Sequence, residues 1–155
     1  MPAVIEGPLL GQSAVCVPIL RLLPDWFGIE AAILNYEREI ESLPTFLARN
    51  GDRVVGLLSL KQHTPYAAEI YVMAVHPEAR RGGVGRAMVG SAEAHARGLG
   101  IEYMQVKTLG PSRPDKGYAQ TRAFYEAMRF RPLEEFNQIW DTDNPCLILV
   151  KRLVI

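Results

Sequence analysis

The chain has 155 residues, with 17 basic and 17 acidic side chains and 48% hydrophobic residues. This length predicts a single domain over residues 1–155, with its core at about 14–153. A net charge of zero creates no overall field that would attract nucleic acid or an anionic membrane, so neither is expected as a partner. No apolar run approaches the ~18 residues of a membrane span and no signal-peptide pattern is present, so a cytoplasmic protein is predicted.

The cysteines do not form a metal-binding pattern. Cys16 and Cys146 lie far apart, without Cys-x-x-Cys spacing and without a His/Cys cluster. Structural zinc sites require such clusters, so no metal is expected. Two distant cysteines are typical of buried thiols in a reducing compartment.

Short elements are predicted first. A β-like run at 14–17 ends at Pro18, and a helical turn at 19–23 is followed by a loop at 25–28. Residues 29–42 predict a helix, because apolar side chains recur at spacings of three and four: Ala32, Ile33, Tyr36 and Ile40.

A meander of strands is predicted next, at 45–49, 53–61 and 68–75. The Asn50-Gly51 pair between the first two strands favours a hairpin turn. Alternation along the third strand predicts that Glu69 shares a face with three following residues: Tyr71, Met73 and Val75.

A helix is predicted from Val84 to about Gly98. Its inward stripe is Val84, Met88, Ala92, Ala96 and Leu99, and the opposite side carries Arg86, Gly90, Glu93 and Arg97. A strand at 103–108, a polar loop at 110–117, a helix at 118–128 and a buried strand at 146–153 complete the prediction. This order predicts a mixed α/β (α+β) domain, with a mostly antiparallel, twisted sheet flanked by helices and one parallel crossover.

The segment Arg80-Arg81-Gly82-Gly83-Val84-Gly85-Arg86 joins a predicted strand to a predicted helix. Unpaired N–H groups at the start of a helix and the positive end of its dipole favour a bound anion. The arginines add positive charge, so the turn predicts a phosphate or pyrophosphate site. Met88 replaces the third glycine of a dinucleotide fingerprint, and the Lys-Ser/Thr of a P-loop is absent, which disfavours a nucleotide-binding module.

The pattern Arg-x-x-Gly-x-Gly at Arg80, Gly83 and Gly85 resembles the acyl-CoA loop of the GCN5-related N-acetyltransferase (GNAT) superfamily. The segment 121–130, Thr-Arg-Ala-Phe-Tyr-Glu-Ala-Met-Arg-Phe, resembles most of that family's next helical motif, with Arg129 in place of the usual glycine. The resemblance extends over roughly 14–153 and implies the GNAT acyl-CoA N-acyltransferase fold. It also implies that acetyl-CoA is held by Met73, Ala74, Val75, Arg80, Arg81, Gly82, Gly83, Val84, Gly85, Arg86, Thr121 and Phe124.

Two catalytic residues follow from the resemblance. Tyr125 stands where the family has a tyrosine near the coenzyme A thiol, as general acid. Glu69 lies eleven residues before Arg80, the spacing of a general-base glutamate in the family's lysine acetyltransferases. Acetyl transfer needs a general acid to stabilise the departing thiolate and a general base to take a proton from the acceptor ammonium. The alternatives stay open: Tyr125 as a packing residue, and Glu69 as a solvated acid.

Trp26, Phe27 and His63 are candidates for the acceptor site, although large aromatic side chains also commonly pack under a sheet. The implied reaction is direct acetyl transfer to a primary amine, with a small-molecule or peptide amine as acceptor. The alternative from a different class is a non-catalytic acyl-CoA sensor or interaction module. A homodimer stays open beside a monomer.

Overall fold

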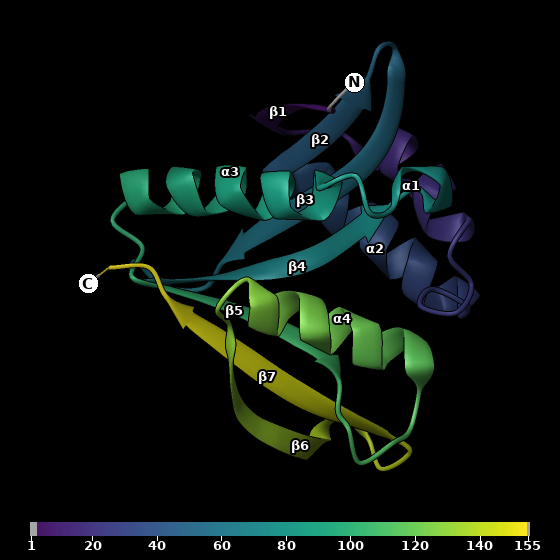
Figure 1. The fold of residues 1–155 in the computed structure, drawn as a ribbon, viewed down its shortest axis with the longest axis vertical. Helices are drawn as coiled ribbons and strands as arrows, with labels where there is room; N and C mark the ends of the chain where they lie inside the picture. The colour runs from purple at the N-terminus through teal and green to yellow at the C-terminus, as the bar shows by residue number, and fades with distance from the viewer. Residues whose placement is uncertain (1–2, 155) are drawn as a thin grey trace.

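The computed structural model describes residues 3–154, within which seven strands form one sheet with four α-helices around it (Figure 1). A short 3-10 turn, Pro77–Ala79, precedes α3. In chain order the elements are β1 (Val4–Leu9), α1 (Ser13–Arg21), α2 (Glu30–Ser42), β2 (Thr45–Asn50), β3 (Arg53–Gln62), β4 (Ala67–Val75), α3 (Val84–Gly98), β5 (Tyr103–Leu109), α4 (Lys116–Ala127), β6 (Arg131–Asp141) and β7 (Asn144–Arg152).

The strand order is β1-β2-β3-β4-β5-β7-β6, and every neighbouring pair is antiparallel except β4 and β5. The parallel pair requires a crossover connection, which α3 provides. The predicted α/β class, with a mostly antiparallel sheet and one parallel crossover, is confirmed. The β2–β3 hairpin also forms, but its two loop residues are Gly51 and Asp52, one position later than predicted, because Asn50 still pairs with Arg53.

Two apolar clusters cover the two faces of the sheet. The larger packs α3 and α4 against one face, with α3 crossing the half made of β1–β4 and α4 lying beside β5 (Figure 1). The smaller packs α1 and α2 against the other face. The predicted inward stripe of α3 is buried except for Leu99, which is 55% exposed because the helix ends at Gly98.

Glu93 on α3 was predicted to face solvent but is buried. Its carboxylate accepts two hydrogen bonds from Lys151 Nζ, at 2.8 and 2.9 Å, and Arg97 lies 3.7 Å away. A buried carboxylate requires such partners, and the sequence pattern does not reveal them because Lys151 lies 58 positions further along the chain. The pair ties α3 to β7.

The two middle strands separate part of the way along the sheet. β4 and β5 pair only between Ala67–Ile70 and Tyr103–Val106. Beyond Ile70 they diverge into the wedge visible between β4 and β5 in Figure 1. On that side the backbone of β4 has no strand partner from Tyr71 onward, so its polar groups remain available to a ligand.

A β-bulge at Tyr71 accompanies this separation. Ser59 pairs with Val72 whereas Leu60 pairs with Ile70, so Tyr71 is an extra residue in β4. A bulge reverses the alternation of side chains that follows it. The prediction that Glu69 shares a face with Met73 and Val75 is therefore wrong, since those two side chains pack in the α3/α4 cluster.

Other differences from the predicted elements occur where local patterns mislead. Residues 14–17 belong to α1 rather than to a strand, because Cys16, Ile19 and Leu20 form one buried helical stripe despite Pro18. The strands β1 and β6 were not predicted. Both are edge strands in which no residue is fully buried, so they lack the alternation that identifies a half-buried strand.

Arg129 ends α4 in the left-handed region, with φ 73°. A residue with a Cβ is strained there by about 1 kcal/mol relative to glycine. Its N–H still donates to the Glu126 carbonyl at 2.9 Å, and Phe130 N–H donates to the Tyr125 carbonyl at 2.9 Å. The cap geometry is therefore the one that a glycine would adopt, and α4 keeps its place.

We expect Arg129→Gly to raise the free energy of unfolding by up to about 1 kcal/mol, because it removes this strain. Thermal unfolding should shift upward by roughly 2–4 °C for a domain of this size. Arg129→Ala is the matched control, since alanine also lacks the arginine head group but keeps the Cβ. An equal gain in both variants would mean that the side chain, rather than the backbone conformation, is responsible.

Candidate active site

The turn between β4 and α3 has the backbone conformation of an anion site. Arg81 and Gly83 have φ values of 67° and 78°, and such left-handed residues in a turn help to form a concave set of N–H groups. Gly83 is the N-cap of α3 and provides no side-chain cap. The first N–H groups of α3 therefore have no capping side chain, as the prediction of an anion site requires.

The three arginines of this turn are exposed. Among residues 3–154, none of Arg80, Arg81 and Arg86 forms an ion pair with a carboxylate. The nearby carboxylate of Glu78 pairs instead with Arg53, at 2.9 Å. Positive charge in the turn is thus left without an internal counter-ion, which favours an external anion.

A cavity of about 440 Å³ lies beside this turn and is lined by the end of β4 and by α4. Every residue predicted to hold the coenzyme lines it except Gly82. The lining also contains Leu23, Ala79, Gly117 and Gln120, which the sequence analysis missed because none belongs to a motif. The α1–α2 loop contributes Trp26 and Phe27, so the cavity is enclosed from both faces of the sheet.

Tyr125 lines the cavity from α4 and is 4% exposed. Its ring makes edge contacts with Phe124 and Phe130, at centroid distances of 5.2 and 5.5 Å. Arg122, one turn earlier, donates to the Leu109 carbonyl at 2.8 Å and anchors α4 to the end of β5. Burial raises the pKa of Tyr125 above the usual value of a phenol, so it stays protonated and can donate a proton.

Trp26 connects α4 with the phosphate turn at the edge of the cavity. Its Nε1 donates to Thr121 Oγ1 at 3.2 Å on α4, and the Arg80 guanidinium lies over its ring at 4.9 Å. A Cβ added to Gly117 would come within 2.9 Å of the indole, so α4 needs a glycine where the tryptophan approaches. Trp26 thus contacts two residues predicted to hold the coenzyme, although it was predicted for the acceptor.

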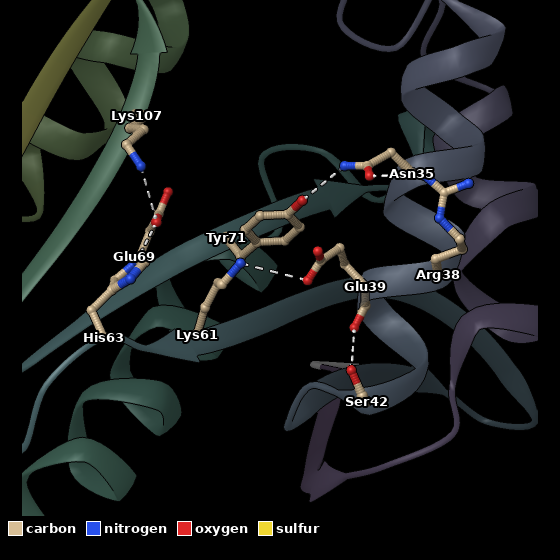
Figure 2. A network of polar contacts seen from close by, with 9 residues as sticks. All are labelled: Asn35, Arg38, Glu39, Ser42, Lys61, His63, Glu69, Tyr71 and Lys107. Carbon is tan, nitrogen blue, oxygen red and sulfur yellow. Dashed lines mark hydrogen bonds and ion pairs between the residues drawn. The ribbon is translucent and has the colours of Figure 1, made fainter. Parts of the chain in front are cut away.

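Phe27 begins a row of aromatic rings that leads away from the cavity. It meets Tyr36 at 5.6 Å, and Tyr36 meets Tyr71 at 5.6 Å. The Tyr71 hydroxyl accepts a hydrogen bond from Asn35 Nδ2 at 3.2 Å (Figure 2). Burial raises the pKa of Tyr36 to about 12, so this row remains neutral at ordinary pH.

Glu69 and His63 lie outside the cavity lining but beside the point where the strands part. Glu69 is 4% exposed and pairs with Gln105, one residue before the last β4–β5 pair. Its Oε1 lies 2.7 Å from His63 Nε2 and 3.3 Å from Lys107 Nζ (Figure 2). The structure brings these three side chains together. The sequence analysis missed Lys107, because alternation along β5 places it with Gln105 on the polar face, opposite the buried Met104 and Val106.

His76, which precedes Pro77, has a structural role. Its Nδ1 accepts the N–H of Glu78 at 3.1 Å and caps the 3-10 turn. In the part of the chain that the structure describes, no group of three or more His, Cys, Asp or Glu side chains could hold a metal ion. None of the helices within residues 3–154 is long and apolar enough to cross a membrane.

Comparisons with known proteins agree with this arrangement. Residues 19–130 match the model of the acetyltransferase (GNAT) family. A mycothiol acetyltransferase of Geodermatophilus obscurus is 39% identical in an alignment 82 residues long, which covers 49% of this chain and 27% of that protein. The match therefore spans about a quarter of the length of this curated relative.

Solved structures resemble the whole chain in fold. A GNAT-family protein from Desulfovibrio desulfuricans superposes with a TM-score of 0.85 at 16% identity, covering 98% of this chain and 99% of that one. An Elizabethkingia anophelis GNAT acetyltransferase with acetyl-CoA bound has a TM-score of 0.71 at 16% identity and 97% coverage of both chains. An aminoglycoside 6′-N-acetyltransferase complexed with coenzyme A has a TM-score of 0.74 at 16% identity and 98% coverage of both. With the family model matched over most of its length, the chain belongs to the GNAT acetyltransferase family.

Proposed function

We propose that the protein transfers an acetyl group from acetyl-CoA directly to a primary amine, within a ternary complex. The observation that carries this proposal is the shared cavity, to which the phosphate turn, the unpaired backbone of β4 and Tyr125 all contribute. The pyrophosphate would bind the turn at Arg80–Arg86 and the pantetheine arm would follow Met73–Val75. The thioester would then lie near Tyr125.

In this reaction the amine nitrogen attacks the thioester carbonyl, the C–S bond breaks and the sulfur leaves as a thiolate. Tyr125 would give its proton to that thiolate, since a donor aimed at developing charge stabilises it. The proton that the attacking nitrogen loses as the amide forms would restore the phenol. The ammonium form of the acceptor must first lose a proton, and we assign that task to the pair of Glu69 and His63.

Direct transfer is favoured over a covalent acyl-enzyme by the state of the two cysteines. Both are buried, and neither lines the cavity. Burial raises the pKa of Cys16 to about 12 and that of Cys146 to about 11, so neither thiol ionises at ordinary pH. A nucleophilic cysteine requires the thiolate form.

The test of this function is release of coenzyme A thiol from acetyl-CoA in the presence of single amines: a polyamine, an aminoglycoside, an amino acid and a lysine peptide. Release that depends on one of these amines, with the acetylated product seen by mass spectrometry, supports the enzyme. Tight coenzyme binding without release from any amine would instead favour a sensor or interaction module.

We expect Gly83→Asp to weaken coenzyme A binding at least tenfold, about 1.4 kcal/mol, because it adds a carboxylate at the anion site. Gly83→Asn separates the effect of the added charge from that of backbone strain, because asparagine is uncharged and tolerates the left-handed region better than most residues. Gly90→Asp is the matched control on an exposed position of α3. Calorimetry that gives equal affinities for Gly83→Asp and Gly90→Asp would contradict the assignment of the turn.

Tyr125→Phe should lower kcat by roughly 10²–10⁴-fold while coenzyme A affinity stays nearly unchanged, because the lost hydroxyl acts on the leaving thiolate. Its raised pKa also predicts no loss of activity from phenol ionisation up to about pH 10. Tyr103→Phe, on an exposed β5 position, is the control. Wild-type kcat in Tyr125→Phe would leave Tyr125 with a packing role alone.

Trp26 provides an optical test of where the coenzyme binds. The chain has two tryptophans, so Trp140→Phe leaves Trp26 as the only one. Coenzyme A should then change the tryptophan fluorescence in a saturable manner, because it would bind in the cavity that the Trp26 indole lines. Trp26→Phe retains Trp140, which is 46% exposed on the edge strand β6, and should show no change. A response carried by Trp140 would contradict the proposed location.

A further inference from the structure

Glu69 is poorly placed to exchange protons with water by itself. Its side chain is 6% exposed, and both His63 Nε2 and Lys107 Nζ contact the same oxygen, Oε1 (Figure 2). The oxygen that would have to receive a proton is thus already occupied by two hydrogen-bond partners. The buried carboxylate is therefore better suited to hold a positive partner than to receive a proton in each turnover.

His63 differs from Glu69 in exposure and in the chemistry of its side chain. Its side chain is 34% exposed. It lies in the connection between β3 and β4, where its backbone N–H donates to the Ala67 carbonyl at 3.0 Å. Imidazole is the side chain that ordinarily gains and loses a proton near neutral pH. General-base catalysis is most efficient when the base titrates near the working pH, which an ordinary carboxylate does not.

The hydrogen bond between the two side chains determines which ring nitrogen is free. A carboxylate can only accept, so Nε2 of a neutral His63 must carry the proton that it donates to Glu69. Nδ1 then has a free lone pair on the other side of the ring. A carboxylate that fixes the tautomer of a histidine and stabilises its protonated form is the arrangement found in catalytic triads.

We propose that Nδ1 of His63 takes the proton of the acceptor amine, and that Glu69 is the positioning residue that holds the imidazole for this step. The inference rests on the proposed acetyl transfer. One proton passes from the acceptor ammonium to Nδ1, and the resulting imidazolium is stabilised by the Glu69 carboxylate. The neutral amine then attacks the thioester, and the exposed imidazolium releases its proton to water.

The other groups that face Glu69 do not serve as the base. Tyr36 from α2, Tyr71 from β4 and Cys146 from β7 all have pKa values raised by burial, so they remain neutral and protonated. Lys107 from β5 donates to Glu69. Lys61, which lies over the Tyr71 ring at 5.2 Å, is paired with Glu39 at 3.6 Å (Figure 2).

The tautomer can be measured in the free protein by nitrogen-15 NMR of the histidine rings. The chain has three histidines, so His63 can be assigned by comparison with His63→Gln. In its neutral form His63 should carry its proton on Nε2, and Glu69→Gln should reduce that preference. A neutral His63 with its proton on Nδ1 would overturn the proposal, because no lone pair would then be free on that nitrogen.

The kinetic test compares His63→Gln, His63→Ala and Glu69→Gln with the most active amine. We expect kcat/KM to fall about 10²-fold or more in His63→Gln, with loss of the near-neutral limb of its pH profile. Added imidazole should restore part of the activity of His63→Ala. His95→Gln is the matched control, since His95 lies on α3 against Phe46 at 5.8 Å, outside the site. Melting temperatures check that each variant is folded.

The outcomes separate the two proposals. If the wild type acetylates amines but His63→Gln keeps its rate and its pH profile, the assignment of His63 is wrong and the proposed function stands. If only Glu69→Gln loses activity and imidazole rescues nothing, Glu69 is itself the base, which also overturns the assignment. If the wild type acetylates no amine, the proposed function fails and the assignment of a base fails with it.

Discussion

The separation of β4 from β5 beyond Ile70 is the constraint on which the rest of the structure depends. Strands in the middle of a sheet normally satisfy each other's backbone groups along their whole length. Here the pairing stops after four residues of each strand, and the bulge at Tyr71 changes which side chains face each cluster. A cavity can therefore enter the middle of the sheet without burying unpaired backbone groups in an apolar core.

This opening divides the chemistry between the two faces of the sheet. The phosphate turn and Tyr125 belong to the side covered by α3 and α4, where the arginines of the turn form no ion pair with a carboxylate among residues 3–154. Glu69 lies before the bulge, near the tyrosines that pack toward α1 and α2. In the proposed reaction the coenzyme and the acceptor would approach from different faces and meet where the strands part. The α1–α2 loop contacts both regions, through Trp26 and Phe27.

The sequence predicts those parts of the molecule that a local pattern determines. The glycine turn at Gly83 and the helix that carries Tyr125 are set by short-range spacing, and the family model supports the resemblance on which their roles rest. The bulge at Tyr71 could not be predicted, because alternation assumes that neighbouring strands stay in register. Lys107 was missed because its partner Glu69 is 38 positions away, and the edge strands were missed because neither contains a fully buried residue.

The buried pair of Glu93 and Lys151 has a mechanical consequence for the distant cavity. It connects α3, which packs on the β1–β4 half of the sheet, to β7 in the other half. Arg97 adds a second connection by donating to the Leu153 carbonyl at 3.0 Å. Lys151 pairs with Met104, which in turn pairs with Ala68, so this contact lies at the end of the sheet where β4 and β5 remain paired. The ion pair therefore crosslinks the two halves of the sheet at the closed end of the wedge, where β4 and β5 contribute four paired residues each.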